Sequence, residues 1–119
     1  MKCGRLEQMI GGWFIGNFVP TILRTPDVEV SVKHYKAGMR DPAHMHRIAT
    51  EVTVIVSGRA LLCGRAWNAG DIILIEPGEA SEFVALTDVV LVAGGAHADA
   101  QPAIAQPLAR PHRSLPGQI

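Results

Sequence analysis

Short runs of strand-forming residues, separated by turn-forming residues, recur along most of the chain. The clearest run is residues 28–35, where Val28, Val30 and Val32 alternate with polar side chains. A period of two places the valines on one face of a strand and the polar residues on the other. Similar runs occupy residues 13–18, 43–46, 52–56, 60–63, 71–75, 81–86 and 89–93, and most gaps hold Gly, Pro, Asn or Asp. Only residues 5–10 suggest a helical turn. The repeated short strands therefore predict an all-β, antiparallel sandwich or barrel.

The size and charge of the chain restrict its organisation and its partners. A chain of 119 residues buries roughly two-thirds of its unfolded surface, which suits a single hydrophobic core. Its 11 basic residues balance its 11 acidic residues, so nothing favours electrostatic capture of nucleic acid or of an anionic membrane. We therefore expect a small-molecule ligand or substrate as the partner, with no nucleic acid and no membrane.

The cysteines and the N-terminus indicate the compartment. Cys3 and Cys63 do not form a CxxC pair, which argues against a disulfide framework and against a cysteine-based zinc site. The N-terminus lacks a charged region followed by an apolar segment, and a membrane-spanning run of about 18 or more apolar residues is missing from the sequence. We expect a cytoplasmic protein.

The last part of the chain differs from the rest in composition. Residues 97–119 are rich in Ala, Pro and Gln and contain Pro102, Pro107, Pro111 and Pro116. Proline at this density interrupts both strand ladders and helices. We therefore divide the chain into a barrel domain, residues 1–96, and a C-terminal tail, residues 97–119.

Two histidines and a glutamate have the spacing of a metal site. His44 and His46 are two residues apart, so on one strand both imidazoles leave the same face and can meet at one ion. Glu51 is an odd number of residues beyond His46, so a turn or bulge within residues 47–50 must redirect it. This donor set suits one divalent ion, with Fe, Mn, Ni, Zn and Cu all compatible.

The same residues carry a resemblance to a known family. Gly38, His44, His46, Glu51 and Gly58 resemble the first conserved motif of the cupins, here residues 38–58. The resemblance implies an antiparallel jelly-roll barrel, also called a double-stranded β-helix, with a metal ion in its mouth. It also implies a homodimer, because many small cupins are dimers.

Residues 70–83 resemble the second cupin motif, but one ligand position differs. The segment has Gly70 and Asp71, then an apolar run and the turn residues Pro77 and Gly78. The family's third histidine is replaced by Ser81, whose hydroxyl coordinates metals weakly. Two imidazoles and one carboxylate with open positions remain, which is the donor set of non-haem iron(II) oxygenases. We place Ser81 and Phe83 beside the predicted pocket.

Other side chains are weaker candidates for the site. Lys33 and Tyr35 follow the polar phase of their strand. If the valines pack outward, both side chains face the interior and could bind or protonate a substrate; the alternative is a solvated strand face. We expect Cys63 to pack inside a strand, and Ser57 with Gly58 to form a hairpin turn.

Two classes of function fit this set of residues. The first is a metal-dependent enzyme that acts on a small oxygen-bearing substrate, by dioxygenase-type or isomerase-type chemistry. A related variant, taken from sugar-modifying cupins, is a metal-free sugar-nucleotide isomerase or epimerase. The second class is a non-catalytic cupin that binds or senses a sugar-like small molecule, and the loss of the third histidine favours it. The sequence lacks a recognisable helix-turn-helix, so we do not expect a sensor that drives its own DNA-binding domain.

Overall fold

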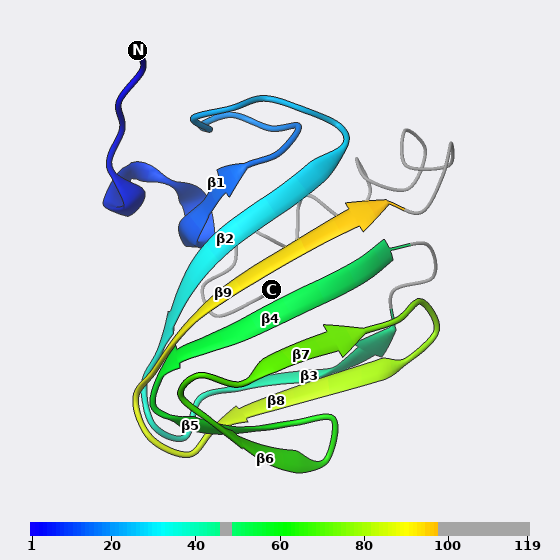
Figure 1. The fold of residues 1–119 in the computed structure, drawn as a ribbon. Coiled ribbons are helices and arrows are strands. Elements are labelled where there is room, and N and C mark those ends of the chain that lie inside the picture. Colours follow the sequence, from blue (N-terminus) through cyan, green and yellow to red (C-terminus); the bar gives the residue numbers. More distant parts are fainter. Residues whose placement is uncertain (46–48, 98–119) are drawn as a thin grey trace.

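The computed structural model describes residues 1–45 and 49–97 and is almost entirely made of strands (Figure 1). Two short 3-10 helices, η1 (Leu6–Gln8) and η2 (Ile10–Gly12), precede the first strand. The strands are β1 (Trp13–Ile15), β2 (Val28–Tyr35), β3 (Arg40–Met45), β4 (Ala49–Ser57), β5 (Arg59–Leu62), β6 (Arg65–Asn68), β7 (Ile72–Ile75), β8 (Ala80–Ala85) and β9 (Val89–His97). The predicted all-β class is confirmed.

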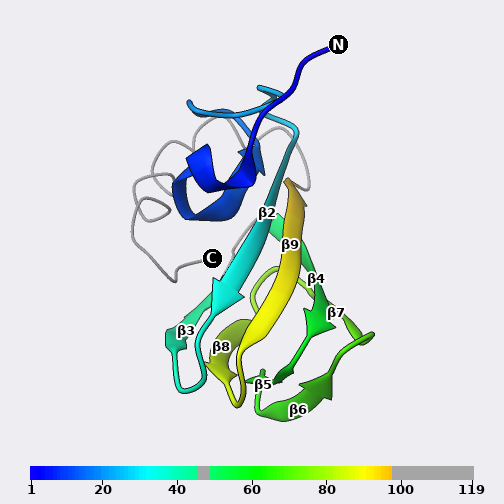
Figure 2. The ribbon, with the colours of Figure 1, turned by 90° about the vertical axis from the view of Figure 1, so that its left-hand side faces the viewer.

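The strands form two antiparallel sheets that face each other. The larger sheet has the order β1-β2-β9-β4-β7 and the smaller sheet the order β3-β8-β5-β6. Figure 2 shows β9, β4 and β7 on one side of the molecule, with β3 and β8 on the other. Consecutive strands β2 and β3, and again β4 and β5, lie in different sheets, so the chain winds between the two layers. This is the predicted double-stranded β-helix, or jelly roll.

Strand β2 turns its polar face inward. Ser31, Lys33 and Tyr35 are at most 3% exposed, whereas Val28, Val30 and Val32 are only partly buried. The alternative of a solvated polar face is therefore wrong. Glu29, at 7% exposed, belongs to the same inner face, so this strand contributes two charged side chains to the interior.

An apolar core packs between the two sheets. It consists of Tyr35, Ile55, Ala60, Leu62, Ile73, Ile75, Phe83, Ala85, Val89, Leu91 and Ala93, with Met39 and Trp67 packed against it. Trp67 also donates a 2.9 Å hydrogen bond from its indole nitrogen to the Leu62 carbonyl. Apolar packing on this scale fixes the two sheets relative to each other, and so fixes the polar groups between them.

The predicted hairpin turn at Gly58 and the predicted packing of Cys63 inside a strand are both wrong. Gly58 (φ +88°) does not close a hairpin, because β4 and β5 lie in different sheets and the residue forms the corner between them. Cys63 is exposed and sits with Gly64 in the two-residue turn joining β5 to β6. Both turn residues have positive φ, 56° and 76°, as a type I′ hairpin requires.

The predicted tail falls almost wholly outside the described residues. Strand β9 ends at His97, and residues 98–119 are not described, so the division into barrel and tail stays a prediction. Within residues 1–45 and 49–97, no helix has both the length and the apolar character needed to cross a membrane.

Candidate functional site

The inner face of the larger sheet is a grid of cross-strand rows set by the strand register. Gly95 on β9 has Glu29 on one side and Glu51 on the other. Ala93 in turn lies between Ser31 on β2 and Thr53 on β4. The central strand thus presents small residues, and the two strands beside it present carboxylates and hydroxyls.

The smaller sheet faces this grid with a second ladder. His44 on β3 pairs with Ser81 on β8, and Asp41 pairs with Phe83. Between these two pairs β3 has two residues and β8 has one, so the register shifts within this segment, as in a β-bulge. Because of the shift, Asp41 and His44 oppose residues that are both buried, Phe83 at 2% and Ser81 at 5% exposed.

The three predicted metal ligands are only partly described. Glu51 is on β4 in the larger sheet and is 9% exposed, whereas the backbone of His44 is in the smaller sheet. The side chain of His44 and the whole of His46 lie outside the described residues. Within the described part of the chain, no three His, Cys, Asp or Glu side chains are grouped so as to hold a metal ion.

Tyr35 is held in the interior by a hydrogen bond and by a ring contact. Its phenol donates a 2.7 Å hydrogen bond to Asp41 Oδ2, and its ring packs against Phe83 with centroids 4.4 Å apart. Burial raises the pKa of Tyr35 well above its usual range, and the hydrogen bond to Asp41 and the charges of Asp41 and Glu51 raise it further. Tyr35 is therefore a neutral hydrogen-bond donor within electrostatic range of Glu51.

Lys33 places a cation on the inner face beside the aromatic N-terminal strand. The residue is 3% exposed, and its Nζ lies 5.3 Å from the centroid of the Trp13 ring. This distance is within the range of a cation–π contact, which is stronger when the groups are desolvated. Trp13 also makes an edge-on contact with Phe18, so the N-terminal segment supports the position of Lys33.

Solved structures with this arrangement of strands are cupins and related double-stranded β-helix proteins. A conserved protein with a double-stranded β-helix domain from Klebsiella pneumoniae is 26% identical, with a TM-score of 0.60 over 66% of this chain and 70% of that one. The fold is that of a small cupin domain. KdgF from a Halomonas species is 21% identical, with a TM-score of 0.57 over 64% of this chain and 75% of that one.

A larger cupin shows the same fold over part of its length. Oxalate oxidase in complex with glycolate is 21% identical, with a TM-score of 0.54 over 61% of this chain and 43% of that one. Comparison with protein-family models and with curated proteins gives no match. The similarity of these cupins to the chain therefore concerns the fold.

Three interior residues of this chain were not among the candidates from sequence. Asp41 was missed because its three-residue separation from His44 puts the two out of phase in a regular strand, and only the β-bulge sets both opposite buried residues of β8. Glu29 was missed because the valines of β2 suggested the core face. Thr53 is 1% exposed, and its Oγ1 has no hydrogen-bond partner among the described residues. Thr53 lies two residues after Glu51 and two before Ile55, so strand alternation could have placed it on the inner face with them.

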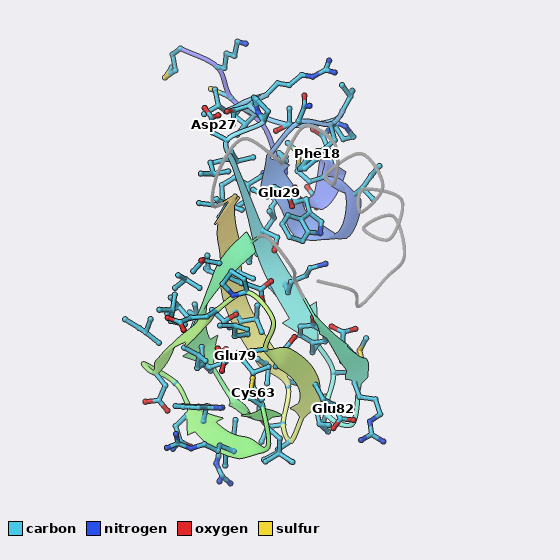
Figure 3. The ribbon with its side chains drawn as sticks, turned by 90° about the vertical axis from the view of Figure 1, so that its right-hand side faces the viewer. Phe18, Asp27, Glu29, Cys63, Glu79 and Glu82 are labelled. Carbon is cyan, nitrogen blue, oxygen red and sulfur yellow. The ribbon has the colours of Figure 1, made fainter. Side chains whose placement is uncertain are left out.

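The turns near β7 and β8 add further acidic groups. Glu79, in the turn between these strands, is exposed, and Figure 3 shows it beside Cys63, away from Phe18 and Glu29 at the other end. Burial and then the charges of Glu79 and Glu51 raise the pKa of the Cys63 thiol. Glu82 points outward and forms a 3.4 Å ion pair with Arg40, so it does not replace the missing histidine.

Proposed function

We propose that this cupin is a metal-binding enzyme that acts on a small oxygen-bearing substrate held between the two sheets. His44, His46 and Glu51 are the proposed ligands of one divalent ion, drawn from Fe, Mn, Ni, Zn and Cu. Lys33 and Tyr35 are the proposed substrate-facing groups, and Ser81 and Phe83 line the same region.

The charge balance of the interior carries this proposal. Over the described residues, the buried charged side chains are Glu29, Asp41, Glu51 and Lys33, three negative and one positive, and their formal sum is −2. A net negative interior attracts a cation. A divalent cation beside Glu51 would be favoured there, and two imidazoles with a carboxylate are donors that transition metals accept.

The protein side chains have separate roles in the proposed site. A bound divalent ion would supply a Lewis acid that polarises substrate oxygens. Lys33 offers three N–H donors and a positive charge to an anionic oxygen of the substrate. Tyr35, neutral and bonded to Asp41, holds that carboxylate in place, and the Phe83 ring packs against the Tyr35 ring.

The class of substrate follows from these groups and from one related fold. Lys33 is buried, and an ammonium group suits a carboxylate or an enolate better than a neutral molecule. The oxalate oxidase with the same fold is bound to glycolate, a small hydroxy acid. We therefore propose a small acid or diketone as substrate, in a cytoplasmic protein that binds neither nucleic acid nor membrane.

A non-catalytic cupin that binds a sugar-like ligand is the second candidate. Ser81 favours it, because this residue occupies the backbone position opposite His44 at which a third imidazole is expected. A site with one ligand fewer binds its metal more weakly, and ligand binding tolerates this loss better than turnover does.

Turnover assays with a matched pair of lysine variants test the proposal. Metal-loaded protein is incubated with diketones, catechols and hydroxy acids while oxygen uptake and substrate loss are followed. We expect turnover of at least one compound, a loss of roughly 10²-fold in kcat/KM for Lys33→Met, and normal activity for Lys36→Met at an exposed position. A metal-loaded protein that consumes none of these compounds would instead support the binding function.

A further inference from the structure

A row of hydroxyl groups crosses the inner face of the larger sheet and has no role in the proposed site. Ala93 on β9 pairs with Ser31 on one side and with Thr53 on the other. We call these three residues the hydroxyl row. Its two hydroxyl-bearing residues are shielded from water, Ser31 at 0% and Thr53 at 1% exposed.

The hydroxyls of this row have hydrogen-bonding capacity left over. Thr53 Oγ1 is buried without a hydrogen-bond partner among the described residues, and Ser31 Oγ donates a long hydrogen bond of 3.4 Å to the Ala93 carbonyl. Unpaired buried polar groups are rare in folded proteins, because each one costs stability. An oxygen-bearing ligand would supply the missing partner.

The hydroxyl row lies between the two groups that hold the ends of the proposed substrate. Thr53 is two residues after Glu51, the proposed metal ligand on β4, and Ser31 is two residues before Lys33 on β2. Each of these steps is about 6.7 Å along a strand. Because β9 lies between β2 and β4, the line from Glu51 to Lys33 passes over Ala93. A substrate held at both ends therefore lies across the row.

The contact of Lys33 with Trp13 places its ammonium group near the same row. Lys33 Nζ lies 5.3 Å from the ring centroid of Trp13, and Trp13 is the residue on β1 that pairs with Ser31. The cation is thus at the β1 end of the hydroxyl row. A carboxylate bound by Lys33 would bring the carbon atoms next to it alongside the hydroxyls.

The width of the row suits a single carbon chain. Ser31 and Thr53 are two strands apart, which separates their backbones by about 9.6 Å, and the side chain between them is only the methyl group of Ala93. A carbon chain roughly 4 Å across, with a hydrogen bond of about 2.8 Å on each side, spans this distance. Hydroxyl groups on such a chain can be bonded from both sides.

We propose that Ser31 and Thr53 bind the hydroxylated middle of the substrate, which is therefore a polyhydroxylated carboxylate and not a diketone or a catechol. The inference rests on the proposed function, since Glu51 and Lys33 hold the two ends. Thr53 is already removed from water, so its bond to a ligand hydroxyl carries no desolvation cost on the protein side. A ligand without hydroxyls gains nothing from this row, and buried polar groups discriminate strongly against such analogues.

Equilibrium binding of two probe acids tests the inference. Gluconate has a hydroxyl on every carbon beyond its carboxylate, and hexanoate has the same number of carbons and no hydroxyls. We expect metal-loaded wild-type protein to bind gluconate at least ~10-fold more tightly than hexanoate in calorimetry. Thr53→Val should lose roughly 10-fold in affinity for gluconate and none for hexanoate. Thr53→Ser keeps the hydroxyl and should retain most of the preference.

Thr50→Val is the matched control for the valine variant. Thr50 is on the same strand, one residue before Glu51, and so belongs to the outer face. This variant should bind both acids as the wild type does. Thr53→Val removes an unsatisfied hydroxyl and should be more stable than the wild type, so a loss of affinity in this variant would not reflect poor folding.

These measurements separate the inference from the proposed function, because they follow binding and not turnover. A wild type that binds neither acid, or both equally, would overturn the inference, and so would a Thr53→Val variant with the full preference for gluconate, even in an active enzyme. A preference that Thr53→Val abolishes in a protein without turnover would support the inference and count against the enzyme.

Discussion

Tyr35 and Asp41 form a buried hydrogen bond of 2.7 Å that joins the two sheets of the barrel. The phenol comes from β2 in the larger sheet and the carboxylate from β3 in the smaller one. Both residues are at most 5% exposed. The bond therefore links the two sheets beside the apolar core, to which Tyr35 belongs.

This bond predicts how stability depends on alkaline pH. Burial, and then Asp41 and Glu51, raise the pKa of Tyr35 above the 10.0 of an exposed phenol. Above pH 10 the unfolded chain loses the phenol proton while the folded chain keeps it, so the free energy of unfolding falls as the pH rises. The chain has one tyrosine, so phenolate absorbance should appear only as the protein unfolds.

The Tyr35→Phe variant is the control for that titration. It should lose about 1–3 kcal/mol at neutral pH, because a buried carboxylate loses a donor. Its remaining stability should change less between pH 10 and pH 12 than that of the wild type. Phenolate absorbance near pH 10 in a wild-type protein whose circular dichroism is still native would contradict this account.

Two glycines with nearly the same backbone conformation should respond differently to alanine. Gly38 and Gly58 have φ of +90° and +88°, but an added Cβ has nothing within 4 Å at Gly38 and meets the Asp88 carbonyl oxygen at 2.1 Å at Gly58. Gly38→Ala should cost about 1–2 kcal/mol for the left-handed conformation alone. Gly58→Ala adds a clash with backbone and should cost at least ~2 kcal/mol more.

Chemical denaturation of the two variants measures this difference. The contrast matters because both glycines belong to the first motif, and only at Gly58 would an added Cβ meet the turn that precedes β9. Equal losses of stability in the two variants would show that the corner at Gly58 is looser than the contact with Asp88 implies.

Thr53 offers a substitution that should stabilise the protein. Its Oγ1 is buried without a hydrogen-bond partner among the described residues, and an unsatisfied buried hydroxyl costs about 1–3 kcal/mol. Thr53→Val keeps the shape and removes that group, so the midpoint of thermal unfolding should rise. Thr53→Ser keeps the hydroxyl and removes a methyl group, and it should lower the midpoint. A fall with valine would mean that the hydroxyl has a partner.

The strands were predictable from the sequence, but the orientation of β2 was not. The alternation of Val28, Val30 and Val32 with polar residues located the strand correctly, yet hydrophobicity alone favours valines on the inside. They face outward because the other face of the strand, with Glu29, Ser31, Lys33 and Tyr35, is the one that points between the two sheets. β6 (Arg65–Asn68) was missed because Arg, Ala and Asn have low strand propensity.

The candidate site was predictable only in part. The spacing of His44 and His46 and the odd offset of Glu51 are local features, and they could be read from the sequence. The pairing of His44 with Ser81 and of Asp41 with Phe83 depends on strands far apart in the chain and on a register shift. No local pattern reports such contacts, so Asp41 was not among the candidates.

Metal content per chain tests the central claim most directly. Purified untagged protein is loaded with each candidate ion, dialysed and analysed for bound metal. We predict about one ion per chain for wild type and for Glu82→Gln, an outward carboxylate paired with Arg40, and almost none for His44→Ala, His46→Ala or Glu51→Gln. Equal and negligible metal in all five proteins, or full occupancy in Glu51→Gln, would contradict the metal site.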